Sequence, residues 1–240
     1  MSVGWAVERP HGPAGALHAS SAELLDVERV ERRARILVAD APAVVLGSHE
    51  PEDWFDPAAL RAAGLDLARR RSGGGAVLVG AGRTLWVDFV VPAGDPLWDD
   101  DVSRASWWVG GLWRDAFAAA GLDEAGALAV WQGPMRRTRW SPVICFAGVG
   151  PGEIEMDGAK LVGVSQRRTR RGALFQSAVL LEWDPGLWLS LLSPAGRAAA
   201  GLAPGRAPDQ VPDDLSRAGY ALGSERERAL VDALLRLLMP

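Results

Sequence analysis

Cys145 and Lys160 are the only cysteine and the only lysine in a chain of 240 residues whose other strong bases are arginines. A cysteine thiolate is a nucleophile that nearby positive charge favours. A lysine ammonium is a compact charge on a flexible stem, better suited than arginine to meeting a single phosphate or carbonyl oxygen. Each also has a plain alternative: a lone cysteine among apolar residues is commonly a small buried hydrophobe, and a lone lysine can be a remnant of an arginine-rich composition.

The segment RRRSGGGAV, residues 69–77, is a second candidate for chemistry. Three successive glycines let the backbone approach a ligand closely. The N–H groups of such a turn, together with flanking arginines, can hold an anion. The Gly-Lys-Ser/Thr ending of a phosphate-binding P-loop is missing, however, and no helix pattern follows. A flexible hairpin turn beside solvated arginines is the alternative.

Strands and turns must position these residues. Asp157-Gly158 is a strong hairpin signal and predicts that GEIEM pairs with AKLVGVSQ. Because side chains alternate along a strand, Lys160 is expected on the same face as Val162 and Val164. A lysine on such a face either extends its amine to water at an edge or points into a cleft.

The rest of the chain indicates an α+β fold. The apolar segment SPVICF predicts a strand that carries Cys145, and strands within 143–183 follow one another without crossover helices. A helix is expected over 20–34, with an apolar stripe of Leu24, Leu25, Val27 and Val30. We expect one catalytic domain over 1–240, with a core at about 20–200, a helix at about 223–239 and no large accessory domain.

Composition narrows the function. A net charge of −4 argues against nucleic-acid binding, and no apolar run approaches the length of a membrane span. One cysteine forms no internal disulfide and no secretory leader is evident, so a cytoplasmic location is expected. The His and Cys spacings match no metal motif, so no metal site is expected. Arginines at 136, 137, 139, 167, 168, 170 and 171 form either a solvated face or a docking site for an acidic partner.

Taken together, RRRSGGGAV and DGAKLVGVSQRR resemble the motifs of the lipoate–protein ligase family, part of the biotin/lipoate ligase and octanoyltransferase group. The family pattern is Arg-Arg-x-Ser-Gly-Gly-Gly-Ala-Val, followed about 80–100 residues later by Gly-x-Lys-[Ile/Val]-x-Gly-x-[Ala/Ser]-Gln. The resemblance covers roughly 20–200. The residues that match are Arg69, Arg70, Ser72, Gly73, Gly74, Gly75, Ala76 and Val77, then Gly158, Lys160, Val162, Gly163, Ser165 and Gln166.

The resemblance implies a mixed, largely antiparallel sheet flanked by helices, as in biotin/lipoate ligase catalytic domains. It implies attachment of a lipoyl or octanoyl group to a lysine of a lipoyl carrier domain, such as glycine-cleavage H protein or 2-oxoacid dehydrogenase E2. A ligase would use ATP with Mg²⁺ and lipoate, and Lys160 would meet the acyl carbonyl and the phosphate. The implied acyl- and nucleotide-binding residues are Arg70, Ser72, Gly73, Gly74, Gly75, Ala76, Val77, Gly163 and Ser165.

Cys145 opens a second route. One octanoyltransferase class resembles the ligases in fold but uses a cysteine that precedes a phenylalanine and lies about fifteen residues before the motif lysine. Cys145-Phe146 and Lys160 show the same order and spacing. That resemblance implies an ATP-independent transfer from acyl carrier protein through an acyl group on Cys145.

The loop 78–86 counts against a ligase, because it lacks the His-Asp step that family members carry. A third alternative is a homologue that binds an acyl group or a carrier protein without turnover.

Overall fold

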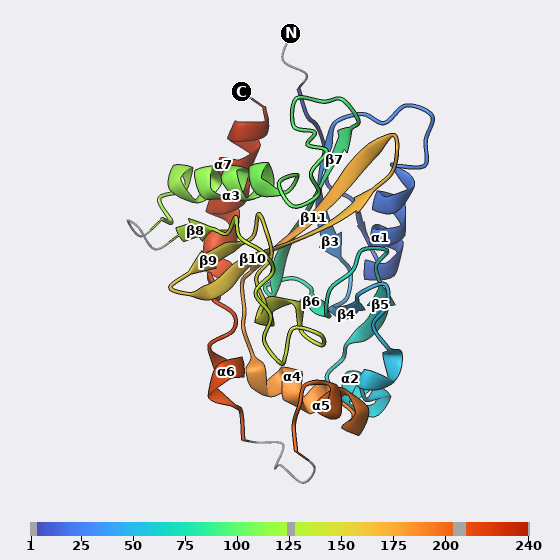
Figure 1. Ribbon diagram of the computed structural model, residues 1–240, viewed down its shortest axis with the longest axis vertical. Helices are drawn as coiled ribbons and strands as arrows, with labels where there is room; N and C mark the ends of the chain where they lie inside the picture. Colours follow the sequence, from blue (N-terminus) through green and yellow to red (C-terminus); the bar gives the residue numbers. More distant parts are fainter. Residues whose placement is uncertain (1–3, 124–127, 204–209, 240) are drawn as a thin grey trace.

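A sheet of eight strands forms the centre of the computed structural model, which describes residues 4–123, 128–203 and 210–239 (Figure 1). One short strand, β2 (His11–Gly12), pairs only with β3. In spatial order the others are β1 (Ala6–Glu8), β3 (Arg33–Ala39), β7 (Thr84–Pro92), β11 (Gly172–Leu180), β10 (Ala159–Arg168), β9 (Ile154–Met156) and β8 (Leu128–Val130).

A second sheet of three strands carries the glycine-rich segment between two of its strands. Its order is β5 (Asp66–Arg69), β4 (Ala43–Leu46) and β6 (Val77–Val79). In the two sheets, β3 is parallel to β1 and β2, and β4 is parallel to β5, while the remaining pairs of described strands are antiparallel. The predicted α+β fold with a mixed, largely antiparallel sheet flanked by helices is therefore confirmed.

Helices cover the sheets from several sides (Figure 1). The pair α3 and α7 crosses one face of the large sheet, α1 lies on the opposite side, and α2, α4 and α5 gather beyond the small sheet. The helices are α1 (Ala14–Glu23), α2 (Pro57–Ala62), α3 (Trp107–Ala119), α4 (Pro185–Leu191), α5 (Pro194–Ala199), α6 (Asp213–Ser216) and α7 (Glu227–Leu238), with single 3₁₀ turns η1 (Glu52–Trp54), η2 (Cys145–Ala147) and η3 (Ser224–Arg226).

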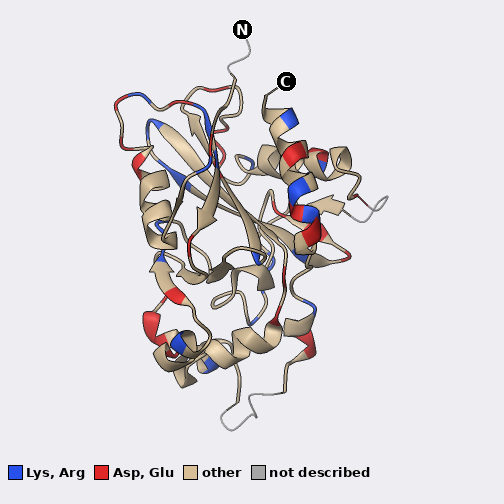
Figure 2. Ribbon diagram, turned by 180° about the vertical axis from the view of Figure 1, so that it is seen from behind, with Lys and Arg blue, Asp and Glu red and all other residues tan. Residues whose placement is uncertain are grey.

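Strand β7 separates two parts of the core because its side chains alternate between them. Val87 and Phe89 belong to the cluster formed with α3 and α7, whereas Trp86 packs with Leu17 of α1. A strand buried on both faces requires a nearly continuous apolar run, which the segment TLWVDFVVP supplies. Charged residues are few on these central strands and gather on exposed elements such as α7 (Figure 2).

The helix predicted over 20–34 is wrong in position. Helix α1 covers Ala14–Glu23, directly after Pro13, and residues after Leu24 form turns. The proposed stripe does not lie on one face: Leu25 is buried in a small cluster, but Val27 is exposed. A proline immediately before an alanine-rich run was the stronger start signal.

Two local predictions near the candidate residues are also wrong. Cys145 lies in the 3₁₀ turn η2, and its neighbour Ile144 forms only an isolated bridge, to Ala76. The Asp157-Gly158 hairpin is present, but a β-bulge interrupts it between Lys160 and Val162. Lys160 pairs with Glu155 and Val162 pairs with Ile154, so the two side chains point to opposite faces.

Helix α3 approaches the loop before β9 so closely that only glycine fits at the contact. A Cβ at Gly110 would overlap the carbonyl oxygen of Gly152 and reach to 2.6 Å from Cγ1 of Val130. A Cβ at the adjacent Gly111 would meet nothing within 4 Å. This contact fixes the loop that carries Glu153.

We therefore expect Gly110→Ala and Gly111→Ala to have opposite effects on the free energy of unfolding, measured by denaturant titration. The first should lower it by about 1–3 kcal/mol, because the methyl group cannot be accommodated without backbone movement. The second should raise it by about 0.5–1 kcal/mol, since alanine is the better helix former. Equal effects of the two substitutions would contradict the close contact.

Candidate active site

The glycine-rich segment is held against the turn that carries Cys145. The N–H of Ala76 donates to Val143 O at 2.9 Å, and the N–H of Cys145 donates to Ala76 O at 2.9 Å. A Cβ at Gly75 would lie 2.8 Å from Ile144 N, so a side chain there would push the two segments apart. The run of glycines therefore allows the loop and the cysteine turn to touch along their backbones.

Arg70 supports this loop from within the protein. Its side chain is buried, and its guanidinium donates to the carbonyl oxygens of Val45, Gly73 and Gly75 at 2.8–3.2 Å. Arg69 is tied to the carbonyls of Gly47 and Glu50 in the same way. Both arginines thus bind backbone carbonyl groups and keep the loop in place. Arg70 also lines a small cavity next to the loop.

Glu50 is buried beneath the same loop. Its Oε2 accepts from the N–H of Gly47 at 3.0 Å, while Oε1 has no partner among the described residues. Burial raises the pKa of Glu50 to about 7, against the opposing effects of the Gly47 hydrogen bond and the charge of Arg70.

Lys160 is 1% exposed, which is rare for a lysine. Its Nζ lies 2.8 Å from Oε1 of Glu153, 3.0 Å from the carbonyl oxygen of Cys145 and 3.7 Å from Sγ of Cys145. Burial alone would lower the pKa of Lys160, but Cys145 and Glu153 outweigh it and raise the pKa above its usual value. The side chain is therefore an ammonium whose three N–H groups face two oxygens and one sulfur.

Glu153 is itself held by backbone donors. Its Oε2 accepts from the N–H of Gly150 at 2.6 Å, and Oε1 accepts from the N–H of Val164 at 2.9 Å. The carboxylate is thereby fixed on both oxygens while Oε1 also pairs with Lys160. A buried ion pair is stable only with such additional hydrogen bonds.

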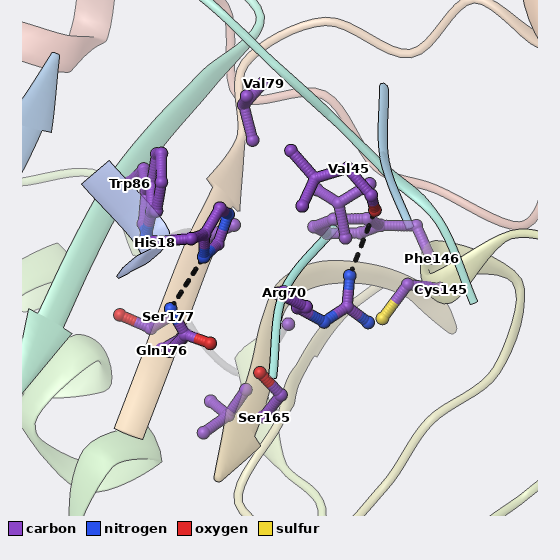
Figure 3. A pocket seen from close by; sticks show the side chains of 14 residues that line it. His18, Val45, Arg70, Val79, Trp86, Cys145, Phe146, Ser165, Gln176 and Ser177 are labelled. Atoms are coloured by element: carbon purple, nitrogen blue, oxygen red, sulfur yellow. Dashed lines mark hydrogen bonds between the residues drawn. The ribbon is translucent and has the colours of Figure 1, made fainter. Parts of the chain in front are cut away.

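Two hollows meet at Cys145. A narrow cavity of about 40 Å³ is lined mainly by apolar groups, including Val45, Val79, Trp86 and Phe146 (Figure 3). An open pocket of about 410 Å³ is lined by the triple glycine, Lys160 and Arg137 among others. Residues that line both are Cys145, Val164 and Ser165.

A chain of buried polar groups crosses the wall of the narrow cavity. Ser72 Oγ donates to Gln176 Oε1 at 3.0 Å and lies 3.0 Å from Ser165 Oγ. Gln176 Nε2 lies 2.9 Å from Nδ1 of His18 and 3.3 Å from Oδ2 of Asp88. Burial raises the pKa of Asp88 to about 6, despite hydrogen bonds from Ser21, Trp86 and Gln176 that oppose the shift.

The structure thus brings most of the predicted residues together. Gly73, Gly74, Gly75, Cys145, Lys160 and Ser165 line the open pocket, and Arg70, Val77, Cys145, Gly163 and Ser165 line the cavity. Ser72 lies behind this surface, where it holds Ser165 and Gln176, and Ala76 serves as the backbone bridge to Cys145.

Sequence reasoning missed Glu153, His18, Gln176, Asp88 and Glu50. Glu155 lies opposite Lys160 in the hairpin, but its carboxylate pairs with Arg136. Glu153 is itself an acidic residue directly before the first strand of the hairpin, and this position was the sequence signal that could have identified it. His18 and Asp88 come from separate elements, and no spacing in the sequence joins them.

Most arginines of the two arginine-rich segments, 136–139 and 167–171, bind other groups of the protein. Arg139 pairs with Asp214, Arg167 donates to Ala22 O, and Arg168 donates to Asp99 O. Within the described ranges, three or more His, Cys, Asp or Glu side chains nowhere gather as metal ligands. The described helices include none that is both long and apolar enough to cross a membrane.

Solved structures establish the fold. Lipoate-protein ligase A bound with ATP is similar over 98% of this chain and 85% of its own, with a TM-score of 0.67 and 17% identity. A putative lipoate protein ligase from T. acidophilum with bound lipoic acid is similar over 98% and 86%, with a TM-score of 0.64 and 17% identity. A bi-partite lipoate protein ligase from Thermoplasma acidophilum, described with its E2 lipoyl domain, is similar over 98% and 93%, with a TM-score of 0.59 and 15% identity.

The sequence itself identifies the family. No curated protein sequence matches the chain. Residues 16–204, however, match the model of the lipoyl protein ligase A/B catalytic domain. The match contains the glycine-rich segment, the Cys145 turn and Lys160 in one continuous region. The chain therefore belongs to the lipoyl protein ligase A/B catalytic domain family of protein-lipoylation enzymes.

Proposed function

We propose that this protein transfers a lipoyl or octanoyl group to a lysine of a lipoyl carrier domain through a thioester on Cys145. The observation that carries the proposal is the 3.7 Å separation of Lys160 Nζ and Cys145 Sγ, at the junction of an apolar cavity and an open pocket. A nucleophile placed there can hold an acyl chain on one side and meet large substrates on the other.

The chemistry proceeds in two displacements. Sγ of Cys145 attacks the carbonyl carbon of a donor thioester; the new S–C bond forms, the donor S–C bond breaks, and the donor leaves as a thiol with the proton. The amine of the carrier lysine then attacks the same carbon; the amide C–N bond forms, the bond between that carbon and Sγ of Cys145 breaks, and a proton from the amine passes to the released sulfur. ATP is not consumed in this route.

Lys160 stabilises the charge that develops in both displacements. Two of its N–H groups are directed to fixed oxygens, on Glu153 and on Cys145, and the third is directed toward the reacting sulfur. A donor held in this way in a site away from water can stabilise a tetrahedral oxyanion. Arginine is a poor substitute because its planar fork cannot make this convergent contact.

The two hollows separate the roles of the substrates. The apolar cavity takes the acyl chain; at about 40 Å³ it is narrow, so its side chains adjust around the chain as it enters. The open pocket takes the thioester end of the donor, such as an acyl carrier protein, and then the lysine side chain of the carrier domain. Glycine-cleavage H protein and 2-oxoacid dehydrogenase E2 are the expected carriers, and the archaeal ligase of similar fold is described with an E2 lipoyl domain.

An ATP-dependent ligase is the second candidate. It is favoured by the backbone of Gly73–Gly75 and by Arg137, which line the open pocket, and by the fold shared with lipoate-protein ligase A bound with ATP. Under that route ATP with Mg²⁺ activates lipoate as an acyl-adenylate, and Lys160 meets the acyl carbonyl and the phosphate. A homologue that binds without turnover is the remaining alternative.

Intact-mass spectrometry separates these routes. We expect octanoyl acyl carrier protein to give a transient octanoyl adduct on the enzyme and then a mass gain on the apo carrier, without ATP. Because Cys145 is the only cysteine, a thioester adduct reports on it alone; hydroxylamine should release the adduct, and Cys145→Ser should lose both the thioester and most carrier acylation.

A parallel incubation with lipoate plus ATP is the control. A carrier mass gain that requires ATP and is equal in Cys145→Ser and the unsubstituted protein would support the ligase and contradict the thioester route. No gain under either condition would leave a binding function.

Lys160→Arg tests whether Lys160 stabilises the oxyanion. We expect carrier acylation to fall about 100-fold or more, the usual effect of losing one oxyanion donor, because a guanidinium cannot occupy this buried position with the same three contacts. Arg61→Lys, an exposed charge-conserving change on α2, serves as the control. Carrier acylation at the unsubstituted rate in folded Lys160→Arg would show that Lys160 does not act on the carbonyl.

A further inference from the structure

The narrow cavity contains a buried hydrogen-bonding atom that has no partner among the described residues, Nε2 of His18. His18 lies on α1, is 7% exposed, and stacks on Trp86 with ring centroids 4.1 Å apart. The remaining wall of the cavity is mainly valine, alanine and aromatic carbon, with polar groups from Arg70, Ser165, Gln176 and Ser177. Nε of Arg70 is also without a partner among the described residues. An unpaired polar atom in such a place is costly unless a ligand completes it.

The hydrogen-bond chain determines which nitrogen of His18 carries the proton. Ser72 donates its only hydroxyl proton to Gln176 Oε1, which places the NH₂ of Gln176 toward Asp88 and His18. Figure 3 shows the contact between Gln176 and His18. Nδ1 of His18 therefore accepts, and a neutral imidazole must then carry its proton on Nε2.

The imidazole is neutral over the working pH range. Burial, with a smaller contribution from Arg70, lowers the pKa of His18 to about 3. The amide of Gln176 lies between Asp88 and His18 and is hydrogen-bonded to both, so the carboxylate of Asp88 is not a direct partner of the imidazole. His18 consequently presents a constant N–H donor to the cavity.

This donor lies at the far end of the cavity from the proposed nucleophile. Figure 3 places His18 and Trp86 on the opposite side of the cavity from Cys145 and Phe146. Cys145 opens into both hollows, whereas His18 and Trp86 line only the narrow one. An acyl chain attached at Cys145 would extend its tail toward His18.

We propose that His18 selects the acyl group by its tail, donating Nε2–H to an acceptor such as a dithiolane sulfur and so favouring lipoyl over octanoyl. The proposal rests on the acyl-transfer function above. The two groups share an eight-carbon chain and differ only in the two ring sulfurs at the far end. Sulfur is a weak acceptor and also packs favourably on aromatic rings such as Trp86. We expect about a five- to tenfold preference, the size of one modest hydrogen bond.

Binding of unreactive amides tests the contact without any acyl transfer. The chain has three histidines, His11, His18 and His49, so ¹H–¹⁵N spectra of the imidazoles are simple, and His18→Phe assigns the His18 signals. We expect lipoamide to shift the Nε2–H resonance and to bind about five- to tenfold more tightly than octanamide, which should leave that resonance nearly unchanged. Equal shifts, equal affinities, or no binding of either amide would overturn the proposal.

Substitution then tests selectivity in turnover. The ratio of lipoyl to octanoyl transfer from matched small-molecule thioesters should fall toward one in His18→Phe, which keeps a ring on Trp86 but has no donor. His11→Phe, at an exposed position on β2, should keep the original ratio. A His18→Phe variant that lowers both transfers equally would show a structural role only and overturn the selection. Failure of the proposed function is distinguishable, because it appears as absent carrier acylation whatever the amides do.

Discussion

The ammonium of Lys160 is buried in the protein interior, and an unpaired charge in that position would cost several kcal/mol. Much of the surrounding architecture meets this constraint. Glu153 supplies the counter-charge, and backbone N–H groups of Gly150 and Val164 hold that carboxylate in place. The close approach of α3 to Gly152 fixes the loop, and the bulge after Lys160 turns its side chain away from the face of Val162. The charge is therefore directed at one carbonyl and one sulfur on the Cys145 turn.

The second organising feature is the backbone contact between the glycine-rich segment and that same turn. Hydrogen bonds between Ala76 and Val143 and between Cys145 and Ala76 join two segments that are far apart in sequence. The nucleophile proposed here and the loop that lines the open pocket are parts of one surface. The buried side chains of Arg70 and Glu50 support that surface through hydrogen bonds to backbone groups. A small region therefore combines the apolar cavity, the Lys160 ammonium and the open pocket.

The sequence was sufficient for the features that depend on local patterns. The Asp157-Gly158 hairpin and the α+β class are present as predicted, since turn residues and apolar runs specify them directly. The mixed sheet flanked by helices is also present, and it was expected from the family resemblance of the two motifs. The position of α1 was not predicted although Pro13 marks its start, whereas the bulge at Leu161 and the 3₁₀ turn at Cys145 were not predicted because packing partners elsewhere in the chain decide them. The same holds for the polar network: Ser72, Asp88 and Gln176 meet His18 only after four separate segments have assembled.

The near-absence of lysine has a consequence for a protein that handles activated acyl groups. Apart from three histidines, its other basic side chains are 25 arginines. A guanidinium stays protonated at neutral pH and is therefore a much weaker acyl acceptor than an amine. The single lysine is 1% exposed and bound to Glu153. The surface therefore offers no lysine amine that could take the acyl group in place of the carrier lysine.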